Sequence, residues 1–179
     1  MVKKVLAIIA PKDFRDEELF VPKQYLEQNN VVVVVASTTK ATAKGKLGGI
    51  QKVDLDLEEV IVDLFDGIFF VGGPGTIIIR SNPYALKIAQ KAFELNKVIG
   101  AICWAPTILA KAGILKNKKA TCWLGEDQEY TSTTKEVLEK FGAKFVEKPV
   151  VVDGKIVTAN GPAAAKEFAK ELLNCLNSS

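Results

Sequence analysis

Cys103 is the residue of this sequence best placed to do chemistry. An unbroken apolar run, Val98–Ile102, leads directly into it, and a helical pattern over residues 105–112 begins directly behind it. Because no turn residues separate the two elements, the chain must bend sharply at the cysteine, as in strand–turn–helix junctions that present a nucleophile. The N-terminus of the following helix offers free N–H groups and partial positive charge, which favour a thiolate. We therefore expect Cys103 to be reactive.

An acidic group is expected to lie beside this thiol. The first predicted strand runs into Asp16, Glu17 and Glu18, and ligands of parallel sheets bind beyond the carboxyl ends of the strands. A carboxyl buried next to sulfur would have a raised pKa and could stay protonated, donating a hydrogen bond to the sulfur. On the residues alone, any of the three acids could fill this role, or simply be a solvated charge in the first turn of a helix.

A glycine turn is expected at the same edge of the sheet. The strand at residues 67–71 ends in Gly72 and Gly73, and glycine allows the close approach and unusual dihedral angles of a tight turn. The backbone N–H groups of Gly73 and Trp104 could face a developing oxyanion. The turn lacks a dinucleotide fingerprint or a Walker lysine, so an ordinary tight turn is the alternative.

The chain contains no histidine, which excludes a Ser-His-Asp triad, a Cys-His pair and a histidine-ligated metal within it. Three widely spaced cysteines make neither a disulfide framework nor a zinc pattern. We therefore expect no metal and no cofactor. Cys122 is either a second redox thiol near the pocket or a core cysteine, and Cys175 is expected to be structural.

Composition indicates an ordinary globular protein that forms one domain over residues 1–179. The hydrophobic fraction is 48%, and 24 basic residues against 21 acidic ones leave a net charge of +3, too little for a dedicated nucleic-acid surface. No apolar run approaches the length of a membrane span, and the N-terminal apolar stretch lacks a signal-peptide cleavage site. We expect a cytoplasmic protein without nucleic-acid or membrane partners.

Apolar runs alternate with helical patterns along the chain. The predicted strands are residues 4–10, 31–36, 67–71, 98–102, 120–123, 150–152 and 156–158. The predicted helices are residues 16–28, 54–64, 82–95, 105–112, 132–141 and 162–176, with a hairpin or loop at 38–52. Pro22 suggests that the first helix is kinked or begins there, the run at 31–36 is typical of a strand buried on both faces, and Asp153-Gly154 predicts a hairpin turn. The alternation predicts right-handed βαβ units and a mainly parallel sheet.

The segment around Cys103, residues 101–115, resembles the cysteine motif of the ThiJ/PfpI superfamily. Further matches lie, in the family's order, at residues 16–19, 71–73, 150–154 and 158–162, so the resemblance covers nearly the whole chain. It implies an α/β fold of the class I glutamine amidotransferase type. This is a three-layer flavodoxin-like sandwich with a mainly parallel central sheet and helices on both faces.

The same resemblance implies roles for individual residues. Cys103 would be the nucleophile and Glu18 the carboxyl that hydrogen-bonds to it, while the amides of Gly73 and Trp104 would form the oxyanion hole. Members of this superfamily usually form homodimers or higher homo-oligomers.

The chain departs from the superfamily pattern at three positions that bear on the pocket. Protease-like members carry histidine directly after the cysteine, where this chain has Trp104. Deglycase-like members have histidine at or near the position of Trp123, and many members have arginine where Asn160 stands. Gly72, Trp123 and Asn160 are the candidates for lining the pocket, although both tryptophans could simply be packing residues.

Three functions follow in order of preference. The first is glyoxalase- or deglycase-like action on small electrophilic carbonyls through Cys103 and Glu18, without a catalytic histidine. The alternative is a non-catalytic sensor of oxidative stress, or a protective protein, that works by oxidation of Cys103. The last is a PfpI-type cysteine peptidase, which a chain without histidine is poorly equipped to be.

Overall fold

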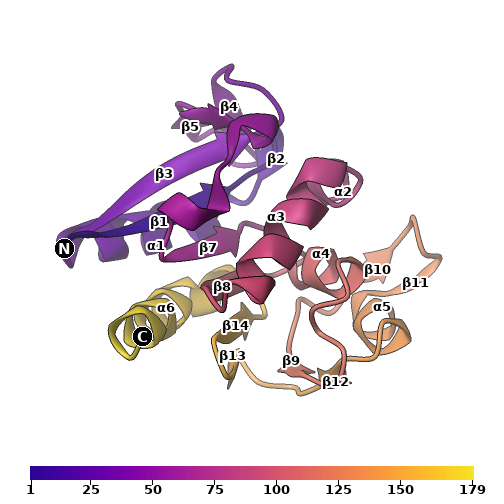
Figure 1. Ribbon diagram of the computed structural model, residues 1–179. Helices are drawn as coiled ribbons and strands as arrows, with labels where there is room; N and C mark the ends of the chain where they lie inside the picture. The colour runs from indigo at the N-terminus through magenta and orange to yellow at the C-terminus, as the bar shows by residue number, and fades with distance from the viewer.

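The β-branched and apolar runs of this chain form the strands of one seven-stranded sheet. The computed structural model describes residues 1–179, and its sheet has the order β13-β14-β8-β7-β1-β3-β6, with all neighbours parallel except β13 and β14 (Figure 1). The predicted mainly parallel sheet is therefore confirmed. The strands are β1 (Lys3–Ile8), β3 (Val31–Ser37), β6 (Leu55–Asp56), β7 (Gly67–Phe70), β8 (Val98–Ile102), β13 (Val150–Asp153) and β14 (Ile156–Ala159).

Helices cover both faces of this sheet, which confirms the three-layer sandwich. The helices α1 (Asp16–Gln28) and α6 (Ala165–Asn177) pack against each other on one face, and α3 (Pro83–Glu94) lies over β7 and β8 on the other (Figure 1). The short helices α2 (Thr76–Arg80), α4 (Pro106–Lys111) and α5 (Thr134–Lys140) continue this second layer. Gly100 permits the close approach of α6, because a Cβ there would come within 2.8 Å of Phe168.

The strand register brings three chain segments to one edge of the sheet. Ile8 of β1 pairs with Phe70 of β7, whose neighbour Ala101 lies on β8. On the other side of β8, Ile102 pairs with Ala159 of β14. The residues that follow these strands therefore meet at the carboxyl edge, where α/β sheets bind ligands.

The helix α1 runs without interruption through Pro22, so the prediction that it begins there is wrong. Leu19, Pro22 and Leu26 share the buried face of this helix. Burial of this apolar stripe offsets the one backbone hydrogen bond that proline cannot donate.

Residues 54–64 do not form the predicted acidic helix. The edge strand β6 is followed by two single 3₁₀ turns, η1 (Leu57–Glu59) and η2 (Val62–Leu64). The side chain of Asp56 caps η1 in a capping box with Glu59, and the β-branched run at 60–62 is a poor continuation for an α-helix.

Several shorter predictions are refined. Residues 38–52 contain the hairpin of β4 (Ala43–Gly45) and β5 (Ile50–Gln51), which β2 (Lys12–Phe14) extends to three strands. Val32 is 46% exposed, so β3, one strand from the sheet edge, is not buried on both faces as predicted. The β13–β14 loop is Gly154-Lys155, since Asp153 still pairs with Ile156.

The predicted strand at 120–123 shortens to β9 (Lys119–Ala120), which pairs with β12 (Lys144–Phe145). The residues after β9 instead bond to the sheet edge, where the N–H of Trp123 donates to the carbonyl of Cys103 at 2.8 Å. A further hairpin of β10 (Glu126–Asp127) and β11 (Ser132–Thr133) follows.

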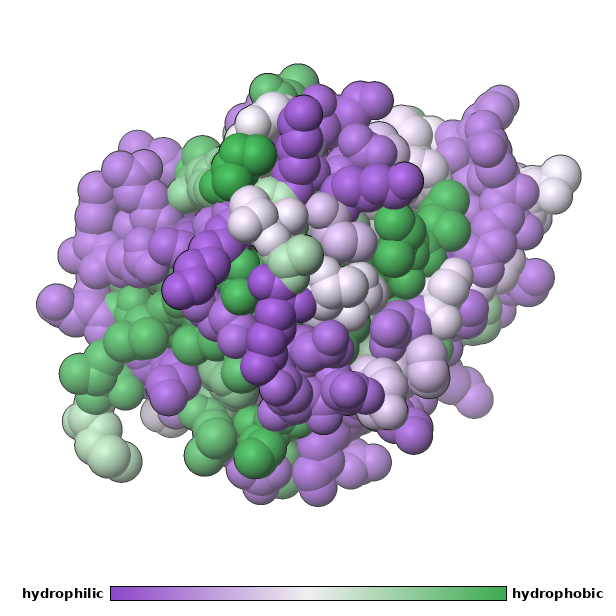
Figure 2. All heavy atoms as spheres, turned by 90° about the horizontal axis from the view of Figure 1, so that it is seen from above, coloured by the Kyte–Doolittle hydropathy of each residue, from purple (hydrophilic) through white to green (hydrophobic).

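The surface seen from above is mostly hydrophilic, with hydrophobic residues in separate patches (Figure 2). None of the helices combines the length and the apolar character that crossing a bilayer requires.

Candidate active site

Cys103 occupies the junction of β8 and α4 in a left-handed backbone conformation. Its φ is +65°, a value that residues other than glycine adopt only when the surroundings impose it, at a cost of roughly 1–3 kcal/mol. Its N–H donates to the carbonyl of Ala159 at 2.8 Å, and its carbonyl accepts from the N–H of Trp123 at 2.8 Å. These two bonds hold the sharp bend that the sequence predicts, with the sulfur at the carboxyl edge of the sheet.

Glu18 is the acid that faces this sulfur. Its side chain is fully buried, and its Oε2 accepts a hydrogen bond from the N–H of Gly72 at 3.0 Å. The other oxygen, Oε1, has no hydrogen-bond partner. The carboxyl nevertheless lies close enough to the Cys103 thiol for each group to affect the pKa of the other.

The two competing acids are used elsewhere. Asp16 accepts the backbone N–H groups of Leu47 and Gly49 at 2.8 and 2.7 Å, and thus ties α1 to the β4–β5 hairpin. Glu17 forms an ion pair with Arg15 at 2.8 Å. Only Glu18 of the three acids is therefore available to the thiol.

Burial raises the pKa of Glu18 to about 8, while hydrogen bonds from Cys103 and Gly72 act in the opposite direction. The carboxyl is accordingly protonated for the most part at neutral pH. This is the state in which it can donate a hydrogen bond to sulfur or to an oxygen bound to it.

The pKa of Cys103 lies above that of an ordinary thiol. Burial is the main cause, followed by the charge of Glu18 and the hydrogen bond with it; the backbone N–H groups of Trp104 and Gly73 lower the pKa, but by less. The N–H groups at the start of the helix do favour the thiolate, as expected, but burial prevails and the resting thiol is protonated. The short helix α4 does not outweigh burial of the sulfur.

The two N–H groups expected to form an oxyanion hole, those of Gly73 and Trp104, both lie at the Cys103 sulfur. Gly73 has a φ of +103°, and a Cβ there would come within 2.6 Å of the backbone nitrogen of Arg15. Glycine is thus required at this position on grounds of both backbone conformation and space.

The two tryptophans form one wall beside the cysteine. The ring centroids of Trp104 and Trp123 are 5.3 Å apart at an interplanar angle of 43°. Trp104 is half-buried, whereas Trp123 is 37% exposed. Asn160, the third departure from the superfamily pattern, is exposed directly after β14, and its backbone N–H donates to the carbonyl of Pro149.

A buried ionic cluster behind Trp104 was not predicted from the sequence. Arg80 and Asp127 are both buried and form a bidentate pair, and the indole N–H of Trp104 donates to the same carboxylate at 2.8 Å. The one sequence signal was Arg80 itself, a charge that ends the apolar run of α2. Nothing in the polar segment around Asp127 distinguished that residue.

The other cysteines take no part in the site. Cys122 is buried, and burial raises its pKa to about 12, as for a core cysteine. Cys175 lies on α6, and all three cysteines are free thiols. No group of three or more His, Cys, Asp or Glu side chains is arranged to hold a metal ion.

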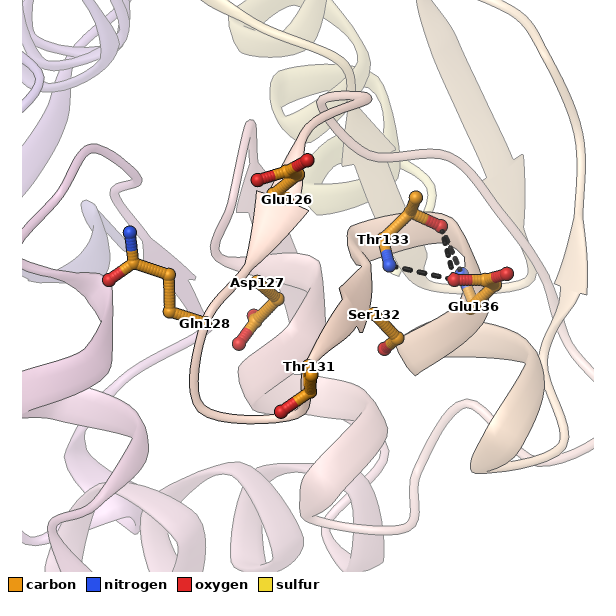
Figure 3. Close-up of a pocket in the computed structure, with 7 residues that line it drawn as sticks. All are labelled: Glu126, Asp127, Gln128, Thr131, Ser132, Thr133 and Glu136. Carbon is orange, nitrogen blue, oxygen red and sulfur yellow. Dashed lines mark hydrogen bonds between the residues drawn. The ribbon is translucent and has the colours of Figure 1, made fainter.

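A separate hollow of about 430 Å³ lies on the β10–β11 hairpin (Figure 3). Its lining has no hydrophobic residue and consists of Glu126, Asp127, Gln128, Thr131, Ser132, Thr133 and Glu136. Cys103 does not line it. Asp127, which is 1% exposed, lines the hollow and also accepts the indole N–H of Trp104.

A model of the DJ-1/PfpI family matches residues 3–175. The chain belongs to this family. It is 32% identical over 171 residues to "Deglycase PfpI" of Pyrococcus furiosus, covering 96% of this chain and 98% of that protein. It is 28% identical over 174 residues to a "Glutathione-independent glyoxalase" of Caenorhabditis elegans, covering 97% of this chain and 89% of that protein.

A solved structure agrees with this membership. The ThiJ/PfpI domain protein from Brachyspira murdochii superposes with a TM-score of 0.91 at 33% identity, over 98% of this chain and 97% of the other. The resemblance inferred from the cysteine motif and the flavodoxin-like fold it implied are both confirmed.

Proposed function

We propose that this DJ-1/PfpI protein acts on small electrophilic carbonyl compounds, in a glyoxalase- or deglycase-like reaction, through Cys103 and Glu18. The observation that carries the proposal is the buried carboxyl of Glu18. One oxygen accepts the N–H of Gly72, the other has no hydrogen-bond partner, and Glu18 and Cys103 each affect the pKa of the other. Such a group can exchange a proton with sulfur and substrate without a histidine.

The first step with methylglyoxal is addition of the Cys103 sulfur to the aldehyde carbon. A sulfur–carbon bond forms, the carbonyl π pair moves to oxygen, and the thiol proton ends on that oxygen, which gives a hemithioacetal. The N–H groups of Gly73 and Trp104 stabilise the oxygen as its charge develops.

Glu18 then moves a proton between the two carbons. The carboxylate form removes the hydrogen of the former aldehyde carbon as a proton to leave an enediolate, and the hydroxyl proton on that carbon shifts to the neighbouring oxygen. The resulting acid then returns its proton to the neighbouring carbon to give a thioester. Water hydrolyses the thioester, which releases lactate and restores the thiol. The net reaction adds one water to methylglyoxal and requires no oxidant or reductant. A pKa of about 8 for Glu18 makes both protonation states accessible near neutral pH.

The names of two relatives support this substrate class. A deglycase and a glyoxalase both align over nearly the whole chain. The wall of Trp104 and Trp123 is apolar at the cysteine, which favours small substrates.

The test is lactate formation from methylglyoxal by the natural protein and by Cys103→Ser and Glu18→Gln variants. We expect lactate from the natural protein only, with Cys175→Ser as the matched control that removes a thiol outside the site and keeps full activity. Equal background rates in the natural protein and Cys103→Ser would remove the catalytic proposal.

A second candidate function is oxidation sensing at the same cysteine. The partnerless Oε1 of a protonated Glu18 could donate a hydrogen bond to a sulfinate on Cys103. The sulfur would take one oxygen from peroxide with release of water, and a second oxygen from another peroxide. Intact-mass analysis after mild peroxide treatment tests this function. Absence of oxygen addition confined to Cys103 would count against it.

A cysteine peptidase remains the weakest of the three functions. The chain has no histidine to act as the general base, and the position after the nucleophile is Trp104, whose indole N–H is already bonded to Asp127.

A further inference from the structure

We infer that Arg80 is a positioning residue that fixes Trp104 from two sides and thereby holds the Trp104 backbone N–H at Cys103. The catalytic consequence rests on the proposed function, because that N–H is one of the two donors to the developing oxyanion. The placement of the donor itself is a property of the resting protein and can be tested without turnover.

The first link runs to the indole ring. Arg80 donates through Nη1 and Nη2 to the two oxygens of Asp127, at 2.5 and 3.0 Å. Oδ2 of the same carboxylate accepts the indole N–H of Trp104 at 2.8 Å. Asp127 therefore joins the guanidinium to the side-chain end of Trp104.

The second link runs to the backbone of the same tryptophan. Nη1 of Arg80 also donates to Oγ1 of Thr107 at 2.9 Å, and this hydroxyl donates to the carbonyl of Trp104 at 2.7 Å. The side chain and the carbonyl of Trp104 are thus both tied to one guanidinium. With the carbonyl of Cys103 held by the N–H of Trp123, the peptide unit that carries the Trp104 N–H has little freedom to rotate.

All five N–H donors of Arg80 are used in this cluster. The remaining two go to Oε2 of Glu129, from Nε at 3.3 Å and from Nη2 at 2.7 Å, and the Tyr130 ring lies 4.8 Å from the guanidinium. Full use of the donors holds the guanidinium in one orientation. Glu129 binds Arg80 from the solvent side and forms no hydrogen bond with Trp104.

Stability alone is a weak reason for such a cluster. Both Arg80 and Asp127 are at most 1% exposed, and removing two charges from water costs solvation free energy that apolar side chains filling the same space would not incur. A buried, fully bonded ion pair does provide a defined geometry. Here the ion pair fixes the position of Trp104, the residue directly after Cys103.

Two variants each break one link by removing a single side-chain hydrogen-bonding group. Trp104→Phe removes the indole N–H, and Thr107→Val removes the hydroxyl. Glu129→Gln is the matched control, since it removes a charge beside Arg80 but keeps an oxygen that can accept from Nε and Nη2, and it touches neither link. Arg80→Gln breaks both links together.

The first readout is the pH dependence of Cys103 alkylation by iodoacetamide, followed by peptide mass spectrometry so that each cysteine is resolved. We expect the alkylation midpoint to move to higher pH in Trp104→Phe and Thr107→Val, because a displaced amide stabilises the thiolate less. The second readout is methylglyoxal turnover, in which kcat should fall about tenfold in each variant. KM should stay within about twofold in Thr107→Val, which leaves both tryptophan rings intact. Glu129→Gln should match the natural protein in both readouts.

Folded Trp104→Phe and Thr107→Val proteins with unchanged alkylation profiles and unchanged kcat would overturn the inference, as would a Glu129→Gln variant with the same losses. If the natural protein forms no lactate, the proposed function fails, and the alkylation shift alone then supports or overturns the positioning role. If Arg80→Gln does not fold, the two single-link variants give the answer.

Discussion

Glu18 and Cys103 meet across Gly72, in a space that no larger residue could share. A Cβ on Gly72 would lie 2.7 Å from Oε2 of Glu18, 2.8 Å from Cβ of Cys103 and 2.5 Å from the carbonyl oxygen of Ile102. The same glycine donates its N–H to Glu18. One small residue thus holds the carboxyl and allows the nucleophile to approach it.

Gly72→Ala should therefore damage the site and the fold together. Because the clash involves a buried carboxyl group and backbone, we expect a loss of roughly 1–3 kcal/mol in the free energy of unfolding and slower methylglyoxal turnover. Urea denaturation and the lactate assay measure the two effects. Gly154→Asn is the matched control, because its φ of +62° and open surroundings suit asparagine. An alanine variant as stable and active as the control would refute this account.

Glu18 should make the folded protein less stable as pH rises. Burial raises its pKa to about 8, whereas a carboxyl in an unfolded chain titrates at about 4.3. Between these two pKa values the folded state binds more protons than the unfolded state. The contribution of Glu18 to the free energy of unfolding is therefore fully present below the lower pKa and is lost as pH rises through the upper one.

The measurement is urea denaturation at several pH values between about 5 and about 9 in the natural protein and in Glu18→Gln. Between the two pKa values, Glu18 should lower the free energy of unfolding by up to roughly 1.4 kcal/mol for each pH unit. Glu18→Gln keeps an acceptor for Gly72 and should flatten the profile. Parallel profiles in the two proteins would show that Glu18 titrates as an ordinary carboxyl.

The pKa of the Cys103 thiol should lie above that of a free thiol, and Glu18 should contribute to this increase. Burial and the charge of Glu18 raise its pKa, so alkylation of Cys103 should still be accelerating past pH ~8.5, where a free thiol is half ionised. In Glu18→Gln the negative charge is absent, and the midpoint should move down.

Iodoacetamide rates across pH, resolved by peptide, give these midpoints, with alkylation after full unfolding as the internal reference. A midpoint for the folded natural protein well below ~7.5 would contradict the description of a protonated resting thiol and restore the activated thiolate expected from the strand–helix junction.

Gly125→Ala should displace the Trp123 ring from its contact with Trp104 beside Cys103. A Cβ on Gly125 would fall within 1.9 Å of the Trp123 ring, so the ring must move away from its position beside Trp104. Because the wall binds substrate and does not itself exchange protons, we expect KM for methylglyoxal to rise about three- to tenfold with a smaller change in kcat.

Tryptophan fluorescence should report the changed Trp104–Trp123 contact in the same variant, with Gly154→Asn again as the control. A KM equal to that of the natural protein, despite a clear fluorescence change, would show that the Trp123 ring does not contact the substrate.

The short-range features of the chain were predictable from its sequence. The apolar run into Cys103 and the helical pattern behind it predict the bend, and Asn82 before Pro83 predicts the start of α3, where the Asn82 side chain accepts two N–H groups. Patterns of this kind depend on neighbours within a few residues. The helix predicted at 54–64 failed because pairing of β6 with β3 and the Asp56 cap prevail over a weak local preference.

The sequence by itself determined that the chemistry must proceed without histidine, that one cysteine stands at a strand–helix junction, and that acids and glycines end neighbouring strands. The family resemblance already implied Glu18 as the partner of the thiol, but only the tertiary structure showed that Asp16 and Glu17 are bonded elsewhere and that burial keeps Glu18 and Cys103 protonated. It alone also joined Arg80 to Asp127 and Trp104. The Gly72–Glu18 and Arg80–Asp127 bonds span 54 and 47 residues of chain, and the pKa of each group depends on how completely distant segments exclude water from it, a quantity that no local pattern encodes.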